Sequence, residues 1–391
     1  MVTVNIEIHG TVDPQFSACL DAFRGNFREG GELGAACAVY RDGELVVDLW
    51  GGSADSKSKA VWEPDTTVPV FSVTKGISAL CILSQVSAGV IDLDRPLAHY
   101  WPEFAVHGKG DISVRRALAH QAGVPLLSGK ITLEDLADTA AMAARLANEP
   151  PLFEPGSTHA YHAVTIGWIT SELMRRVTGQ TVGSWFRSTL AEPLDLNIQI
   201  GRGADARPAV AVVEVPAEYD TPELDPDLIP ARAITLNGMF PASLSGLVAG
   251  LNDPAMQRVE LAGANGVADA RSLSRLYSKA IGGGGEAPLL SDGTLRDACE
   301  VVSAGTPLGQ EFPGPTWGAG LMLPWAVQPM LGEGSFGHDG AGGSLAFAHA
   351  PSGVSFAYVR NRFGQPGVKD PLVYAVVDAL AQTLGLSIPD Y

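Results

Sequence analysis

A serine and a lysine stand three residues apart at the start of an apolar run in this sequence. Ser72 and Lys75 lie in the stretch "VFSVTKGISA", and Ile77 and Leu80 begin the apolar face that follows. Residues three apart on a helix share one side, so the lysine amine can reach the serine hydroxyl. Burial disfavours the ammonium form and leaves a neutral amine that can take the serine proton. The pattern therefore predicts a serine nucleophile with a lysine base.

The same S-x-x-K spacing occurs a second time, so the spacing alone is a weak signal. Ser56 and Lys59 lie in a polar, turn-like stretch, where a lysine is hydrated and protonated. At Ser72, by contrast, the free N–H groups and the positive end of a helix would lie close to a developing oxyanion. A simpler interpretation is that Ser72 caps the helix and Lys75 extends to solvent from its first turn. The G-x-S-x-G motif of the α/β-hydrolases does not occur.

The residues before this serine predict a helix and a β-hairpin. Apolar residues recur at helical spacing over 13–27, and Asp13 stands at the expected N-cap. Two β-rich runs, 34–40 and 44–50, are separated by a short segment that contains Asp-Gly, which favours a tight hairpin turn. Residues 74–90 then form the first strongly buried helix, which would carry the lysine.

The rest of the chain is mostly helical until strand character returns near the C-terminus. The late apolar runs and the final helix lie at 317–325, 343–351, 353–361 and 370–385. Strands at both ends of the chain predict one sheet completed by the two termini, and hence an α+β fold. We expect a sheet domain formed by 1–95 and 308–391, and a mainly helical domain formed by 96–307. The cleft between the two is the expected place for a site.

Composition narrows the classes of function. The chain has 391 residues, is 46% hydrophobic and carries 26 basic against 43 acidic residues, for a net charge of −17. This charge repels phosphate backbones and anionic lipid, so we expect no nucleic-acid partner. Neither a secretion signal nor an apolar run of about eighteen residues is present, which favours a cytoplasmic protein without a membrane span. Four scattered cysteines suggest neither a disulfide framework nor a zinc site.

Several separated segments together resemble a known family. They are "FSVTKGISAL", "IDLDRPLAHYWPEF", "SVRRALAHQAGVP", "FEPGSTHAYHAVTIGWITSELMRRVTG" and "FGHDGAGGSLAFAHAPSGVSFAYV". In order and spacing they resemble the serine β-lactamase-like hydrolases, and among these most closely the family VIII carboxylesterases and lipases. Those enzymes are relatives of the class C β-lactamases and D-alanyl-D-alanine peptidases. The resemblance covers roughly residues 14–385 and implies an antiparallel sheet flanked by helices, with an inserted helical domain.

The resemblance assigns roles to the first two motifs. It implies that Ser72 is the acylated nucleophile and that Lys75 activates it. The second motif of the family, a tyrosine followed two residues later by asparagine, falls on "YHA", so Tyr161 matches and Ala163 does not. A phenol hydrogen-bonded to a lysine can pass a proton between serine, leaving group and water. Without the family, Tyr161 would be read as an ordinary half-buried tyrosine.

The third motif, K-T-G in β-lactamases, falls on His338, Asp339 and Gly340. The lysine that would hold a substrate carboxylate is thus replaced by histidine. The resemblance places an oxyanion-hole N–H on the next residue, Ala341, opposite the N–H of Ser72. Taken alone, "HDG" would favour a turn, and a lone histidine is more often structural than catalytic.

Other polar residues of the matching segments receive supporting roles. We expect His120 to pack or to hydrogen-bond, and Asn265 with Gly266 to form a loop or a helix cap. The histidines contain no H-E-x-x-H, and His159 with His162 is a weak pair, so no metal or other cofactor is predicted.

The sequence thus predicts a cofactor-free serine carboxylesterase that hydrolyses short-chain, neutral esters of small molecules through an acyl-enzyme on Ser72. A β-lactamase or D-alanyl-D-alanine peptidase is the nearest alternative, and the altered second and third motifs disfavour it. An acyltransferase would use the same catalytic residues. A non-catalytic protein that binds a ligand in the same cleft is disfavoured by the presence of Ser72, Lys75 and Tyr161. The oligomeric state cannot be read from the sequence.

Overall fold

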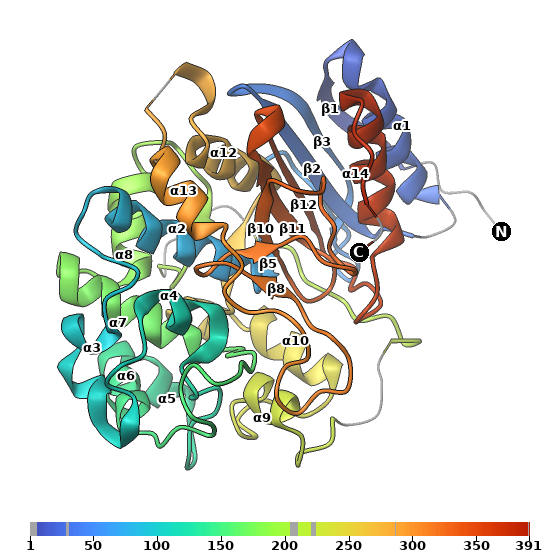
Figure 1. Cartoon of the computed structure of the whole chain (residues 1–391). Coiled ribbons are helices and arrows are strands. Elements are labelled where there is room, and N and C mark those ends of the chain that lie inside the picture. Colours follow the sequence, from blue (N-terminus) through green and yellow to red (C-terminus); the bar gives the residue numbers. More distant parts are fainter. Residues whose placement is uncertain (1–5, 29–30, 204–209, 220–223, 286, 390) are drawn as a thin grey trace.

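A central antiparallel sheet unites the two ends of the chain (Figure 1). The computed structural model describes residues 6–28, 31–203, 210–219, 224–285, 287–389 and 391. The strand order is β1-β3-β2-β12-β11-β10-β9-β8, and β4 pairs with β3 beside this path. The strands are β1 (Ile8–Val12), β2 (Gly34–Arg41), β3 (Glu44–Asp55), β4 (Ala60–Val61), β8 (Thr316–Trp317), β9 (Met322–Leu323), β10 (Ser335–Asp339), β11 (Leu345–His349) and β12 (Val354–Arg360). Since β2 pairs with β12, the termini do complete one sheet, as the sequence predicts.

The hairpin of β2 and β3 forms where the sequence predicts it. Its turn residues Asp42 and Gly43 have φ angles of 50° and 84°. Positive φ at both positions is what a tight hairpin turn needs, and Asp-Gly supplies it at little cost. Asp13, the expected N-cap, accepts a hydrogen bond from Gln15 N and begins a short 3₁₀ turn that leads into α1 (Ser17–Asn26).

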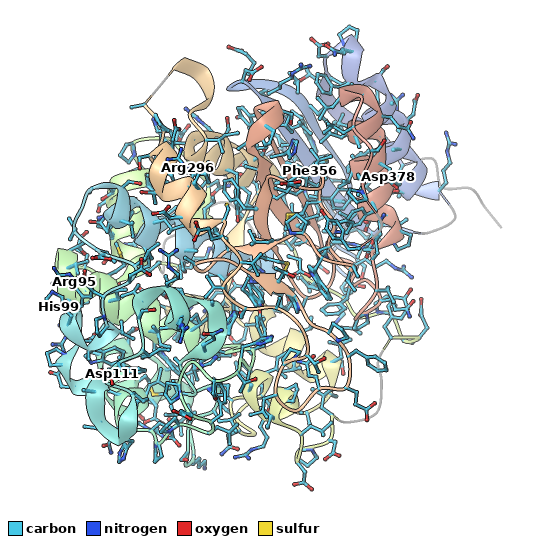
Figure 2. All side chains as sticks on the ribbon, viewed as in Figure 1. Arg95, His99, Asp111, Arg296, Phe356 and Asp378 are labelled. Carbon is cyan, nitrogen blue, oxygen red and sulfur yellow. The ribbon has the colours of Figure 1, made fainter. Side chains whose placement is uncertain are left out.

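Successive residues of a strand point to opposite faces of the sheet, and the two faces bury side chains of different size. One face carries small residues such as Ala38 and Ala357, and α12 (Ala270–Ala280) packs against it. The other face carries bulky residues such as Phe356, and α1 and α14 (Pro371–Leu384) cover it side by side (Figure 1). Figure 2 labels Phe356 on β12, among the side chains between the sheet and α14. The small residues let helices approach closely on the side of the sheet that carries the candidate site.

The middle of the chain is mainly helical. Its helices are α2 (Val73–Ser87), α3 (Leu97–Tyr100), α4 (Val114–Arg116), α5 (Leu133–Leu136), α6 (Thr139–Ala147), α7 (Ile166–Thr178), α8 (Val182–Phe186), α9 (Ile229–Ile234), α10 (Leu244–Asn252), α11 (Pro254–Arg258) and α13 (Asp292–Ala298). Helix α2 is buried along most of its length and contacts both α7 and strand β10. Among the residues described, no helix combines the length and the apolar character that crossing a bilayer requires.

A second, three-stranded sheet was not expected from the sequence. Its order is β5-β7-β6, with β5 at Val68–Phe71, β7 at Gly266–Ala268 and β6 at Ile198–Gln199. Strand β5 ends one residue before Ser72, and β7 pairs with it in antiparallel fashion. This sheet therefore fixes the start of α2 against the segment around 266.

Candidate active site

Ser72 lies at a sharp turn between β5 and α2. The residue before it, Phe71, has a φ of 49°, a left-handed conformation that non-glycine residues rarely adopt. Such a residue costs on the order of 1–3 kcal/mol and persists only where the surrounding structure holds it. Here the Phe71 ring packs edge-on against Phe363, and its carbonyl accepts a hydrogen bond from Thr74 Oγ1 at 2.5 Å. The turn directs Ser72 into a pocket.

The side chains of Ser72, Lys75 and Tyr161 meet at hydrogen-bonding distance. Lys75 Nζ lies 3.2 Å from Ser72 Oγ, and Tyr161 OH donates to the same oxygen at 2.9 Å. Ser72 makes no side-chain capping bond to α2. Lys75 is buried, with 4% of its surface exposed, so it does not extend to solvent. The structure therefore disfavours the simpler interpretation of a capping serine and a solvated lysine.

Lys75 is held by two backbone carbonyls besides the serine. Its Nζ donates to Ala163 O at 2.7 Å and to Gly263 O at 2.6 Å. Burial lowers the pKa of Lys75 to about 7, and the nearby Asp339 opposes this shift. A neutral amine has two N–H groups and one lone pair, so the two carbonyls use both hydrogens. The lone pair is then left to face the hydroxyl of Ser72, which is the arrangement that a general base needs.

Backbone carbonyls contact Lys75 around the position where the second motif has alanine instead of asparagine. At Ala163 the carbonyl oxygen, rather than a side-chain amide, accepts from Lys75. The second carbonyl, of Gly263, lies in a turn ordered by Asn265. The amide of Asn265 donates to Met256 O and Val259 O, and its side-chain oxygen accepts from Leu261 N. Asn265 thus has the loop-forming role that the sequence suggests, in the loop that holds Lys75.

The tyrosine is held in place by histidines that accept backbone N–H groups. His120 Nδ1 accepts from His162 N at 3.1 Å, and His162 Nε2 accepts from Val124 N at 3.1 Å. Burial lowers the pKa of His162 to about 4 and holds that of His120 well below its usual value. Both rings are therefore neutral near pH 7 and serve as structural hydrogen-bond acceptors. His162 has no free ring nitrogen for a metal, because Nδ1 lies 2.6 Å from Ala160 O.

The phenol of Tyr161 is kept protonated. Its ring stacks on Trp317 with centroids 5.8 Å apart and lies 4.9 Å from the ring of His120. Burial raises the pKa of Tyr161 far above neutrality, and its hydrogen bond to Ser72 only partly offsets this. At neutral pH it acts as a hydrogen-bond donor, whereas Lys75 is the group that titrates near pH 7. Nothing in the sequence pointed to Trp317.

The third motif forms a glycine-rich turn beside the serine. A Cβ on Gly340 would lie 2.2 Å from Val70 O, so only glycine allows this approach between β10 and β5. Gly340 N donates to Ser344 O and Gly343 N donates to Gly340 O, which closes the turn around Ala341. In the part of the chain that the structure describes, the N–H of Ala341 has no hydrogen-bond partner.

His338 lies apart from the pocket. Its side chain is fully buried, Nδ1 is 2.6 Å from Asp339 O, and the ring lies 5.3 Å from that of Trp317. Nε2 is buried without a partner among the described residues. Burial is the largest cause that lowers the pKa of His338, which keeps the ring neutral near pH 7. The structure thus brings Ser72 and Ala341 to the pocket wall and leaves His338 behind it.

The pocket next to Ser72 is apolar. Its lining consists of Phe71, Ser72, Tyr161, Ala163, Val164, Ile234, Phe240, Leu244, Leu247, Val248, Leu251, Leu261, Ala264, Ala341 and Phe363. Only the serine and the tyrosine among these described residues have polar side chains, and none is charged. Four of them lie on α10 at the spacing i, i+3, i+4 and i+7, so one stripe of this helix forms a wall. Nothing in the sequence marks this stripe as a pocket wall, because an apolar helix near the middle of the chain looks like ordinary core.

The second S-x-x-K pair lies elsewhere. Ser56 and Lys59 are exposed in the turn between β3 and β4, and Ser56 Oγ hydrogen-bonds the carboxylate of Glu214. The two pairs have the same spacing, but the polar stretch around Ser56 is exposed, whereas Lys75 in the apolar stretch after Ser72 is buried. Among the described residues, no group of three or more His, Cys, Asp or Glu side chains is arranged to hold a metal ion.

The chain belongs to the Beta-lactamase family, whose pattern matches residues 20–381. It is 35% identical to the Esterase/beta-lactamase LipL of Mycobacterium tuberculosis over 384 residues, which cover 92% of this chain and 84% of that protein. A family VIII carboxylesterase structure superposes with a TM-score of 0.85 at 31% identity and covers 96% of this chain and 100% of that one. A penicillin-binding protein homologue from Caulobacter crescentus gives the same TM-score at 35% identity, with the same coverage. The protein is therefore a hydrolase with the β-lactamase-like fold, related to esterases.

Proposed function

We propose that this protein is a serine carboxylesterase that hydrolyses neutral carboxylic esters through an acyl-enzyme on Ser72. The observation that carries the proposal is the contact of Ser72 Oγ with Lys75 Nζ at 3.2 Å and with Tyr161 OH at 2.9 Å, at the wall of an apolar pocket. A lysine with a pKa of about 7 is neutral in roughly half of the molecules at pH 7 and can act as a base.

Acylation begins when Ser72 Oγ gives its proton to Lys75 and bonds to the carbonyl carbon of the ester. The oxyanion that forms accepts hydrogen bonds from the N–H groups of Ser72 and Ala341. When the oxyanion collapses, the bond to the alcohol oxygen breaks. Tyr161 gives its proton to that oxygen and recovers one from Lys75, and both side chains lie within hydrogen-bonding distance of Ser72 Oγ. The products are a free alcohol, an acylated serine and a neutral lysine.

Deacylation uses the same groups in reverse order. A water molecule attacks the acyl carbon, and its proton passes to Lys75 by way of Tyr161. The bond to Ser72 Oγ breaks, and this oxygen takes back the proton. The carboxylic acid leaves, and the resting protonation of all three side chains is restored.

Charge supports neutral esters over β-lactams or D-alanyl peptides, which carry a carboxylate beside the scissile bond. No charged residue is found in the described pocket lining, and the buried His338 has a lowered pKa. An anion in this pocket would find no cation among the described lining residues, and an unpaired anion costs about 1–3 kcal/mol or more. The net charge of −17 adds repulsion at long range. Short-chain esters such as p-nitrophenyl butyrate are the first substrates to test.

The test combines a labelling experiment with a matched pair of variants. A fluorophosphonate probe should add to Ser72, as found by peptide mapping of the labelled protein. Ser72→Ala should abolish hydrolysis of p-nitrophenyl butyrate and leave the unfolding midpoint nearly unchanged, because Ser72 makes no capping bond. Ser56→Ala, in the exposed second S-x-x-K pattern, should change nothing. Full turnover by a folded Ser72→Ala variant would contradict the proposal.

The substrate class is tested by comparing kcat/KM for p-nitrophenyl butyrate and for nitrocefin on one preparation. We expect the ester to be favoured by at least about tenfold, which corresponds to about 1.4 kcal/mol and lies within the cost of an unpaired anion. A higher value for nitrocefin would overturn the substrate class but not the role of Ser72.

A further inference from the structure

The α10 wall is an apolar helix face that is only partly covered. Leu244, Leu247 and Leu251 are half-buried, while Val248, between them on the same stripe, is 3% exposed. Leucines that are left partly uncovered on the inner side of a helix usually complete a core or await an apolar partner. Here they face the pocket that contains Ser72.

The segment that precedes α10 packs closely against the helix at two glycines. A Cβ on Gly246 would lie 2.4 Å from the Pro241 ring, and one on Gly250 would lie 2.9 Å from the Phe240 ring. The two glycines therefore let the preceding segment lie directly against the helix. This contact fixes the rotation of α10, with its leucines toward the serine.

The pocket has room for a chain of several carbons. Its volume of about 80 Å³ accommodates about five to eight groups of the size of water or a methylene, at about 10–15 Å³ each. Ile234 of α9 also lines the pocket, and this apolar side chain is 38% exposed. An unbranched chain that starts at Ser72 could thus run along the leucines of α10 toward Ile234.

We propose that the α10 stripe selects esters that carry an apolar group of six or more carbons, and that Leu247 and Leu251 set the limit of its size. This inference rests on the proposed function, and it moves the preferred chain length beyond the short acyl groups expected from the sequence. The apolar group can belong to the acid or to the alcohol of the ester. In either case the hydrocarbon would contact the leucines of α10.

Two substrate series distinguish these sources. In the first, p-nitrophenyl acetate, butyrate, hexanoate and octanoate vary the acid; in the second, ethyl, butyl and hexyl acetate vary the alcohol and are followed by titration of the released acid. We expect kcat/KM to rise in one series by up to about fourfold per methylene. Burying one methylene group away from water contributes about 0.8 kcal/mol, which corresponds to a factor of about four at room temperature. The series in which kcat/KM rises shows whether the apolar group belongs to the acid or to the alcohol. A maximum at acetate or butyrate in the first series, together with no rise in the second, would overturn the inference.

Variants on α10 test the residues themselves. Leu247→Trp should lower kcat/KM for the longest favoured ester at least tenfold more than for acetate, because the indole fills the pocket. Ala249→Trp is the matched control, since Ala249 lies on the same helix but is exposed. Leu251→Phe is a milder second variant if the tryptophan disturbs folding. Equal effects of Leu247→Trp and Ala249→Trp on the chain-length profile would contradict the role of the stripe.

The outcomes also separate this inference from the proposed function. If Ser72 is labelled and acetate is hydrolysed, but chain length has no effect, only the α10 inference fails. If no ester in either series is hydrolysed, or if Ser72→Ala retains turnover, the proposed function fails first.

Discussion

The pKa of Lys75 makes a quantitative prediction about the pH dependence of the reaction. An exposed lysine, with a pKa of about 10.4, is neutral in roughly one molecule in 2,500 at pH 7. Burial lowers the pKa of Lys75 to about 7, so about half of the molecules carry a neutral amine. The fold therefore increases the fraction of usable base on the order of 1,000-fold, and this gain should disappear when the amine cannot lose its proton.

The assay is kcat/KM for p-nitrophenyl butyrate between pH 5 and pH 9. In the proposed mechanism the neutral amine is the active form, so we expect the rate to rise about tenfold per pH unit below the pKa and to level off above about pH 7. Lys75→Arg should lose about 1,000-fold or more, because a guanidinium stays charged throughout this range. Lys59→Arg, in the exposed turn, should match the wild type.

The same shift has a consequence for stability with a definite sign. The folded pKa of Lys75 lies below the unfolded value, so between about pH 7 and 10.4 the unfolded chain binds the additional proton. The free energy of unfolding should therefore rise with pH in this window, by about 2–3 kcal/mol from pH 7 to pH 9. Lys75→Met should lack this rise when the two proteins are compared by urea unfolding at both pH values.

Two results would refute this reasoning. A wild-type rate that is flat from pH 5 to pH 9 would show that no group titrating near pH 7 controls the reaction. A Lys75→Arg variant with normal turnover would show that the amine is not the base, whatever its pKa.

Two further predictions concern the groups around the serine. Tyr161→Phe should lower kcat by about 10²–10⁴ with little change in KM, because the lost group moves protons rather than binding substrate; a normal kcat at every pH would contradict the proton-transfer role. Arg360 and Asp370 form a buried ion pair that packs against the glycine-rich turn of the third motif. A Cβ on Gly343, in this turn, would lie 3.0 Å from Asp370 Oδ2 and 3.1 Å from Arg360 Nη1. Asp370→Asn preserves the N-cap of α14 but weakens the ion pair, and we expect kcat to fall about tenfold to 100-fold with KM nearly constant. Asp138→Asn, at the N-cap of α6, is the control, and equal kcat values in the two variants would contradict this positioning role.

Local patterns in the sequence were sufficient for much of the fold. The Asp-Gly turn, the β-rich runs near the two ends of the chain and the apolar face after Lys75 all act over a few residues, and each is found in the structure. The position of Tyr161 came from the family resemblance instead. Ser72 and Tyr161 are 89 positions apart in the chain, and no local pattern links residues at that distance.

What the sequence could not reveal depends on contacts between distant segments. The left-handed Phe71 has no signature, because its conformation is imposed by the pairing of β5 with β7 and by its packing on Phe363. Helix α10 looks like core in the sequence, and its place at the pocket depends on contacts that no local pattern shows, including the packing of Pro241 and Phe240 against its glycines. The three-stranded sheet is built from strands too short to show alternation.

Burial of Lys75 links the base to the choice of substrate. The pKa of this lysine is low because it is buried, and its hydrogen-bond partners, two backbone carbonyls and the Ser72 hydroxyl, are uncharged; the nearby Asp339 only partly offsets this. A carboxylate bound within about 4–6 Å would raise that pKa by about 1–3 units and would lower the neutral fraction at pH 7 by a similar number of powers of ten. In the proposed mechanism an anionic substrate would therefore need a second cation to offset its charge. His338 of the third motif is neutral and buried outside the pocket lining, so the proposed mechanism requires a neutral substrate for Lys75 to remain a base.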